Sequence, residues 1–197
     1  FTLTVIVGKK KLSLAEMGQE TEEENKSETL AVEQDTENND TEEIAEVTSL
    51  NAFLTGKVIP LKEVGDGVFS EGVMGDGLAI IPENDTLYAP ADAEVSVLME
   101  ESGHACGLTL ENGMEILLHV GIDTVEMKGD GFEYLVSQNQ KVKAGTPLIR
   151  FDRDKIKAAG HPDVTVCIIT EEGNAKNIQF ITGIHAEANK MKVVSFE

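Results

Sequence analysis

Residues 105–120 read ACGLTLENGMEILLHV, and this stretch decides how the rest of the chain is interpreted. Ala105 to Glu111 and Met114 to Val120 alternate or run apolar over the length of a strand. Asn112-Gly113 lies between them, and this dipeptide is the strongest short-range hairpin signal. The stretch therefore predicts a β-hairpin in which Asn112 and Gly113 are the two loop residues.

The length of that loop sets which residues face one another. With two loop residues, Glu111 pairs with Met114 and Cys106 faces His119. Because side chains alternate between faces, His104 then shares a face with Cys106, roughly 7 to 8 Å diagonally from His119 between backbone positions. Two imidazoles can touch across that gap. A three-residue loop with a bulge would instead shift the register by one and place the histidines on opposite faces.

The charge of the chain limits its partners. The 197 residues carry a formal net charge of −20, and residues 12–50 hold thirteen acidic residues against Lys26 alone. Nucleic acid is excluded as a partner because clustered Lys and Arg are missing, and a basic protein surface is expected instead. Cys106 and Cys167 form no CxxC pair, which fits a reducing, intracellular setting without disulfides or a thiolate zinc site.

Three segments are predicted along the chain. Residues 1–11 are a short apolar run ending in three lysines, as at the cytoplasmic end of a membrane helix, although a first β-strand or an introduced segment would read the same way. Residues 12–47 are predicted to be an acidic disordered linker, because few large apolar residues offset the entropy of ordering it. A partly helical structure over residues 30–46 is the alternative to a fully disordered linker. Residues 48–197 are the predicted globular domain.

The predicted domain is all-β, a sandwich or barrel with one or two short helices. Short apolar stretches are broken repeatedly by glycine and proline from Thr48 onward, a pattern typical of many short strands. Near-continuous apolar runs at 78–81, 114–120 and 164–169 predict sheets covered on both faces. A helix is predicted over Arg153 to Ala159, with Asp152 as N-cap and Gly160 after its end. Residues 134–142 could add a turn of helix or a strand.

An ordered series of motifs from Thr48 to Glu197 resembles the glucose-type enzyme IIA domain of the bacterial phosphoenolpyruvate:sugar phosphotransferase system. The series consists of GDGLAIIP (75–82), APAD (89–92), GHA (103–105), LHVGIDTV (118–125), KGDGF (128–132) and 142–152. Residues 156–160 and the membrane-like tail most resemble the versions fused behind a transport domain in β-glucoside, sucrose or trehalose permeases. The loop at residues 99–103 is one residue longer and more acidic than in those versions.

The resemblance implies an antiparallel β-sandwich that acts as a phosphotransferase without a cofactor or a resident metal. A phosphoryl group would pass from the histidine phosphocarrier protein to His119, and then to a cysteine of a sugar-specific IIB domain. His104 would support the group without carrying it. The resemblance also implies a membrane IIC domain upstream in the same polypeptide, which would tether this cytoplasmic domain to the membrane.

The chemistry of histidine explains these implied roles. A nucleophilic imidazole must be neutral, so its other nitrogen should donate a proton to a fixed acceptor, which the family likeness places at the carbonyl of Gly121. His104, and Ser102 where the family usually has a hydroxyl residue, would donate hydrogen bonds to the phosphoryl oxygens. Cys106 is interpreted as a packing residue.

Five further residues match positions that the resemblance assigns to partner binding. Asp66 and Asp123 would face an arginine beside the histidine of the donor. An apolar ring around the site would include Phe69, Leu117 and Val125. Each aspartate could equally be a solvated surface carboxylate, whereas each apolar side chain, taken alone, is more typical of the core than of an interface.

Two other functions share part of this pattern. Met127-Lys128 and Met191-Lys192 each match half of the Met-Lys-Met hairpin that carries biotin, but neither lysine has a methionine on both sides. Two histidines and an aspartate could bind the zinc of a hydrolase, but the His-x-His pair of similar-looking β-sandwich peptidases is missing. His161 and His185 are interpreted as surface residues.

Overall fold

The structure, a computed structural model, describes residues 47–197. The predicted end of a membrane segment at residues 1–11 lies outside this range, and so does the predicted linker at 12–47 apart from its last residue. Within residues 47–197, no helix is long and apolar enough to cross a membrane.

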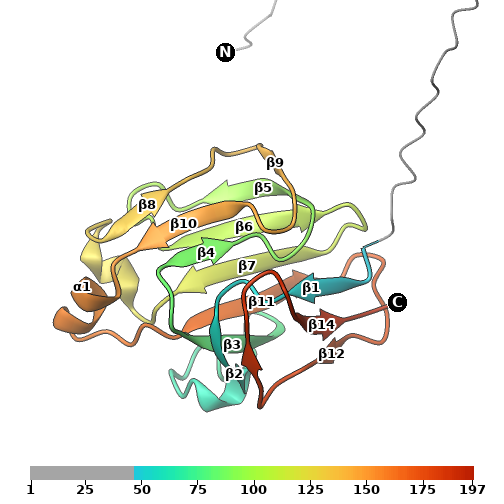
Figure 1. The fold of residues 1–197 in the computed structure, drawn as a ribbon, viewed down its shortest axis with the longest axis horizontal. Helices are drawn as coiled ribbons and strands as arrows, with labels where there is room; N and C mark the ends of the chain where they lie inside the picture. Colours follow the sequence, from blue (N-terminus) through green and yellow to red (C-terminus); the bar gives the residue numbers. More distant parts are fainter. Residues whose placement is uncertain (1–46) are drawn as a thin grey trace, which may run out of the picture. The chain divides into compact units, whose positions relative to one another are not determined.

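Short strands make up most of the described part of the chain (Figure 1). It forms one α-helix, α1 (Arg153–Ala158), and two 3-10 helices, η1 (Leu61–Glu63) and η2 (Thr124–Met127). The strands are β1 (Ser49–Asn51), β2 (Gly56–Pro60), β3 (Asp76–Pro82), β4 (Thr86–Tyr88), β5 (Ala93–Leu98), β6 (Ala105–Leu110), β7 (Glu115–Val120), β8 (Phe132–Tyr134), β9 (Lys141–Val142), β10 (Pro147–Phe151), β11 (Thr165–Glu171), β12 (Gln179–Phe180), β13 (His185–Ala186) and β14 (Lys192–Ser195).

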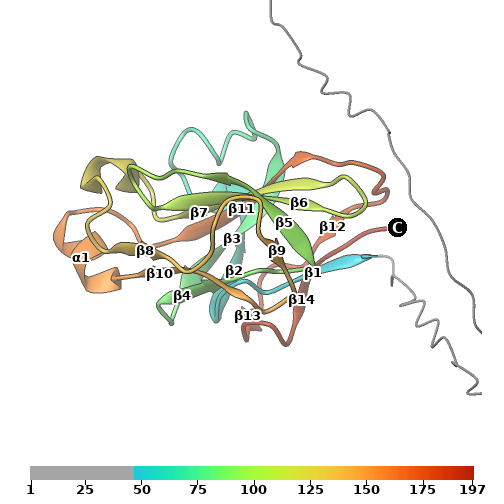
Figure 2. The same cartoon turned by 90° about the horizontal axis from the view of Figure 1, so that it is seen from above.

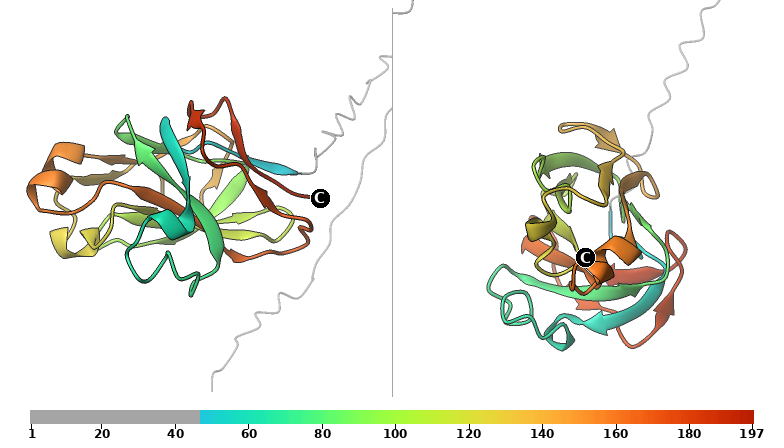
Figure 3. Two further views of the ribbon diagram at one scale, coloured as in Figure 1. Left: turned by 90° about the horizontal axis from the view of Figure 1, so that it is seen from below. Right: turned by 90° about the vertical axis from the view of Figure 1, so that its left-hand side faces the viewer.

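The strands form one long sheet and two short ones. The long sheet has eight strands in the order β13-β2-β3-β11-β7-β6-β5-β9, and the three-stranded sheets have the orders β4-β10-β8 and β1-β14-β12. Every pairing between these strands is antiparallel. Figure 2 shows the β4-β10-β8 sheet as a layer beside β6 and β7, and the end-on view in Figure 3 shows the long sheet curving around the other strands. The predicted antiparallel β-sandwich is confirmed.

Apolar side chains pack on both faces of the long sheet, as its continuous apolar strands predict. The larger cluster fills the interior between the sheets and includes Leu78, Ile116, Leu118 and Cys167. A smaller cluster lies on the opposite face of the same strands: Ile59, Leu61, Phe69, Ala79, Ile122, Val166 and Ile168. The second cluster matters for function because the histidines lie at its border.

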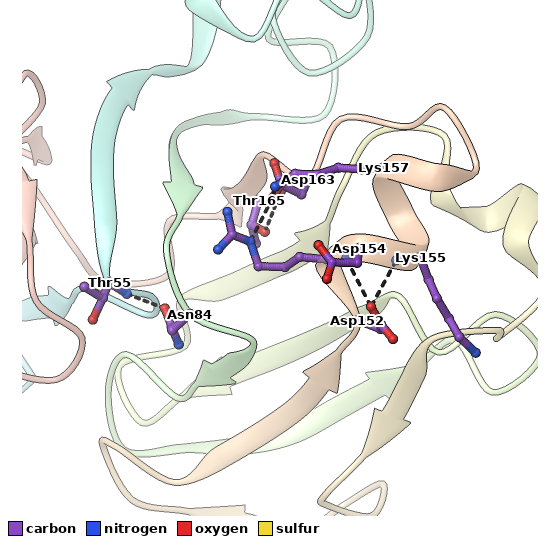
Figure 4. Close-up of polar contacts among 9 residues, drawn as sticks. Thr55, Asn84, Asp152, Asp154, Lys155, Lys157, Asp163 and Thr165 are labelled. Atoms are coloured by element: carbon purple, nitrogen blue, oxygen red, sulfur yellow. Dashed lines mark hydrogen bonds and ion pairs between the residues drawn. The ribbon is translucent and has the colours of Figure 1, made fainter.

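Helix α1 begins and ends as its sequence predicts. The carboxylate of Asp152 accepts hydrogen bonds from the backbone N–H groups of Asp154 and Lys155, as Figure 4 shows, and Gly160 has a left-handed φ of 88°. Lys157 in the same figure lies beside Asp163, which also accepts a hydrogen bond from Nε of Arg153 at 2.9 Å. The undecided stretch at 134–142 contains the last residue of β8 and the whole of β9, and no helix.

The register of the β6–β7 hairpin differs from the predicted one. Ala105 faces His119 and Cys106 faces Leu118, because the loop has three residues, Glu111 to Gly113. Leu110 N–H donates to Met114 O at 2.8 Å, and Gly113 has a φ of 82°. The loop is thus the bulged three-residue type, the alternative to the predicted one. The predicted two-residue loop, and with it Cys106 opposite His119, is therefore wrong.

His104 lies next to His119 in spite of this shift, because His104 is not part of the strand. The β6 strand begins at Ala105, and Gly103 before it has a φ of 66°. His104 itself lies at a bend between this glycine and the strand, so the alternation of faces along β6 does not extend to it. The conclusion that the two imidazoles can touch is correct, but the diagonal pairing that led to it is not.

Candidate functional site

His119 lies at the end of a row of residues that crosses the outer face of the long sheet. Antiparallel register places His119 opposite Val166 of β11 and Ala105 of β6, and Val166 opposite Ala79 of β3. Because directly opposed residues share a face, His119 lies on the face that carries the smaller apolar cluster. His119 is half-buried.

A backbone carbonyl holds the ring of His119. Nδ1 of His119 lies 2.8 Å from the carbonyl oxygen of Gly121. Since a carbonyl can only accept, Nδ1 must carry the proton, and this leaves a lone pair on Nε2. The acceptor that the family likeness places at Gly121 is therefore present in the geometry.

Thr124 fixes the turn that contains this carbonyl, and no role for it was predicted. Its side chain is fully buried, and its hydroxyl donates to the carbonyl oxygen of Val120 at 2.6 Å. The turn is also held from outside, because Ile122 N–H donates to Pro162 O at 3.0 Å. Threonine often bonds to the carbonyl four residues before it, so the Val120 to Thr124 spacing is a sequence signal for this contact.

His104 packs edge to face against His119. The ring centroids are 4.4 Å apart and the ring planes make an angle of 79°. His104 is 5% exposed, and its Nδ1 lies 2.8 Å from Oγ of Ser102, which is 7% exposed. Phe132 of β8 also borders the ring of His104, with centroids 6.5 Å apart. Ser102 is therefore hydrogen-bonded to the histidine pair through His104.

Asp66 and Phe69 belong to one turn, which borders His119. Both carboxylate oxygens of Asp66 accept backbone hydrogen bonds at 2.9 Å, one from Phe69 and one from Ser70. This turn presents Phe69 to His119 with ring centroids 4.9 Å apart, and Phe69 is only 8% exposed. Asp66 thus shapes the apolar wall beside His119.

The remaining residues assigned to partner binding lie around this centre. Leu117 is half-buried on the same face of β7 as His119 and packs against the smaller apolar cluster. Asp123 and Val125 lie on the turn that follows Gly121, where both are exposed, Val125 to 56%. His161 and His185 lie elsewhere, and His185 is exposed and pairs with Glu83 at 3.0 Å.

Burial keeps both histidines neutral. Burial, followed by the neighbouring charge of His104, lowers the pKa of His119 to about 4, against the opposing effects of the Gly121 carbonyl and Asp66. Burial also lowers the pKa of His104. For Asp66, burial favours the neutral acid, but the backbone hydrogen bonds from Phe69 and Ser70 outweigh it and lower the pKa. At neutral pH the site holds two uncharged imidazoles beside a carboxylate.

Cys106 takes no part in the site. Its side chain is fully buried in the interior cluster on the opposite face of the sheet from His119, and burial raises its pKa to about 12. Within residues 47–197, no three His, Cys, Asp or Glu side chains form a group that could hold a metal ion.

Known proteins share this sequence and fold. The mannose-specific EIIBCA component of the PTS system of Corynebacterium glutamicum is 46% identical over 142 residues, which are 72% of this chain and 20% of that protein. The glucose-specific EIIBCA component from the same organism is 44% identical over 144 residues, 73% of this chain and 20% of that protein. The chain thus spans about a fifth of the length of these relatives.

A solved structure and a family pattern agree with these relatives. The glucose permease IIA from Mycoplasma capricolum is 33% identical and superimposes with a TM-score of 0.68, covering 75% of this chain and 94% of that one. Residues 48–175 match the family described as phosphoenolpyruvate-dependent sugar phosphotransferase system, EIIA 1. The chain therefore belongs to the EIIA 1 family of the phosphoenolpyruvate-dependent sugar phosphotransferase system.

Proposed function

We propose that this domain carries a phosphoryl group on Nε2 of His119 between two protein partners during sugar uptake. The observation that carries the proposal is the hydrogen bond from Nδ1 of His119 to the Gly121 carbonyl, beside a second histidine 4.4 Å away. That bond selects the tautomer in which Nε2 has its lone pair free for attack on phosphorus. A pKa of about 4 supports the same role, because the ring stays unprotonated at neutral pH.

The phosphoryl group would move in two displacement steps. In the first, the lone pair of His119 Nε2 forms a bond to phosphorus while the bond from phosphorus to the donor's histidine nitrogen breaks, and the donor nitrogen keeps the electron pair. In the second, a cysteine thiolate of the IIB domain attacks phosphorus, and the bond to Nε2 breaks. The group stays at the same oxidation level throughout, so neither step needs a redox cofactor.

His104 would stabilise the negative oxygens of the group in transit, and Ser102 would act through His104 by setting its tautomer. Oγ of Ser102 lies closer to His104 Nδ1, at 2.8 Å, than to the carbonyl of Met99, at 3.4 Å. We therefore assign the Ser102 hydroxyl as a donor to Nδ1. Nε2 of His104 then carries the ring proton and can donate it as a hydrogen bond to a phosphoryl oxygen.

The proposed partners follow from the surface around the histidines and from the relatives. Exposed apolar and acidic side chains, among them Val125 and Asp123, suit a docking face with both apolar and basic groups, which fits the histidine phosphocarrier protein as donor. Leu117, Phe69 and Asp66 would shape that surface beside His119. Because the Corynebacterium relatives are EIIBCA components, we propose IIB and IIC domains in the same polypeptide, which would hold this domain at the cytoplasmic face of the membrane.

Phosphorylation of purified protein tests this function directly. The chain is mixed with labelled phosphoenolpyruvate, enzyme I and the phosphocarrier protein, and acid-labile label on the chain is measured. The parent and a His185→Gln control should both accept phosphate, whereas His119→Gln should accept none. Labelled His119→Gln would show that another residue carries the group, and an unlabelled parent would refute the proposed function.

A further inference from the structure

The strand pair that leads into His104 opens at one position. The β5–β6 pairing ends at Leu98 opposite Cys106. The next backbone bond, from Met99 N–H to Ala105 O, is stretched to 3.4 Å. Residues 99–104, which include Ser102 and His104, form the loop beyond this point.

The hydroxyl of Tyr134 occupies the opening. It accepts a hydrogen bond from Met99 N–H at 2.8 Å and donates one to Ala105 O at 2.5 Å. Tyr134 therefore ties together the first residue of the loop and the residue that follows His104. Tyr134 comes from β8, a strand of the β4-β10-β8 sheet, so the loop is held by a different sheet from the one that it extends.

A second residue of β8 supports the same loop. Phe132 packs against the ring of His104, and a Cβ atom on Gly103 would lie 2.9 Å from the Cβ of Phe132. β8 thus supports the loop in two ways: Phe132 packs against His104 and beside Gly103, and Tyr134 bonds to Met99 and Ala105 at the two ends of the loop. Burial raises the pKa of the half-buried Tyr134 to about 12, and the protonated hydroxyl donates to Ala105 O.

We infer that Tyr134 is a positioning residue for phosphoryl transfer: its hydroxyl bridges Met99 and Ala105 and so fixes His104 in place beside His119. This role rests on the proposed function, because it concerns the support of the phosphoryl group and not its acceptance. Without the hydroxyl, Met99 N–H and Ala105 O can close their 3.4 Å gap directly. The domain would remain folded, but the loop would be drawn in and His104 displaced.

Tyr134→Phe removes only the bridging oxygen, and the chain supplies a matched control. Tyr88 is the other tyrosine, lies half-buried on β4 of the same sheet, and its hydroxyl makes no hydrogen bond within residues 47–197. Tyr88→Phe is therefore the same chemical change without the bridge. Urea unfolding of both variants gives the stability baseline against which the other readouts are compared.

Two readouts separate positioning from a general loss of stability. In phosphoryl transfer, Tyr134→Phe should leave labelling of His119 within about twofold of the parent and slow the transfer to IIB by about 10- to 100-fold, the range expected for a misplaced group. In the His104→Gln background, the same change should slow transfer no further, because the residue through which it acts is gone. In NMR spectra, the imidazole signals of His104 should shift in Tyr134→Phe and stay unchanged in Tyr88→Phe.

Different results would overturn the role of Tyr134 and the proposed function. The inference is overturned if Tyr134→Phe matches Tyr88→Phe in the His104 signals, or if it slows transfer as much in the His104→Gln background as in the parent. An unlabelled parent would refute the proposed function instead. The NMR comparison would still test whether Tyr134 positions His104, since it needs no phosphoryl donor.

Discussion

The imidazole rings of His104 and His119 meet edge to face, with their centroids 4.4 Å apart, although the two residues do not oppose each other in the β6–β7 ladder. A phosphoryl group on Nε2 of His119 would therefore lie within reach of His104. In the proposed function His119 alone supplies the lone pair, so acceptance and onward transfer should depend on the two rings differently.

His104→Gln should accept phosphate at close to the parental level but pass it on slowly. The loss of one preorganised donor in a transfer site costs roughly 100- to 1,000-fold in rate. Rapid-quench measurement of label on the domain and on IIB separates the two steps. Equal loss of acceptance and transfer would show that His104 helps to form the phosphohistidine, contrary to the assignment.

Gly103→Ala should destabilise the domain by about 1–3 kcal/mol, the usual cost of a side chain in a disfavoured backbone conformation combined with a close contact. Gly103 has a φ of 66°, and a Cβ there would press against Phe132 at 2.9 Å. Gly160→Ala is the matched control, since Gly160 has a φ of 88° but a Cβ there would meet no atom within 4 Å. Urea unfolding should therefore show a larger loss for Gly103→Ala. A smaller loss there than at Gly160 would contradict the packing argument.

Thr124→Val should loosen the turn that holds His119. The change keeps the shape of the buried side chain but removes the hydroxyl that donates to Val120 O at 2.6 Å. An unsatisfied buried acceptor costs about 1–3 kcal/mol, which urea unfolding would measure. Thr124→Ser retains the donor, so it should keep the Nδ1 proton signal of His119 in NMR spectra, whereas Thr124→Val should weaken it. If both variants keep the signal, the hydroxyl does not order the turn.

The unprotonated His119 should make the domain less stable as the pH falls. Its pKa is about 4 in the folded chain and near 6.5 when unfolded, so between these values the unfolded state binds a proton that the folded state does not. Folding stability is therefore lost as the pH drops from about 6.5 toward 4, by roughly 2–3 kcal/mol from this group at pH 4.5. His119→Gln lacks this loss.

Urea unfolding of the parent and His119→Gln at pH 7.5 and 4.5 isolates the contribution, because the other titrating groups are common to both. His185→Gln serves as the control, since His185 is exposed. A difference between parent and His119→Gln that does not change with pH would show that the folded-state pKa is not depressed.

The sequence predicts those helices and strands whose formation depends on residues close to one another in the chain. Asp152 caps helix α1 through N–H groups two and three residues away, and Gly160 ends it, so its composition was enough to place it. The strands of the long sheet carry apolar side chains on both faces, which is visible as unbroken apolar runs. The two histidines and the family could likewise be identified from ordered motifs.

Contacts between distant segments decided the geometry of the site. In the hairpin, Asn174 N–H donates to Asn112 O at 2.9 Å, and the backbone of Gly173 packs against Gly113. These contacts hold the three-residue loop, and Asn-Gly alone does not distinguish it from the two-residue one. The register, and with it the separation of Cys106 from His119, follows from that packing.

The position of His104 has the same kind of origin. Tyr134 bonds to Met99 and Ala105 across 35 and 29 residues of sequence. The sequence pattern of β8 does not predict that a hydroxyl on this strand bonds to another sheet. A period of two predicts only which face of the sheet a side chain occupies. The sequence by itself identified the two candidate histidines and the strand that holds His119. Only the tertiary structure decided how the two histidines meet, because the hairpin register and the position of His104 depend on hydrogen bonds between segments that no local pattern connects.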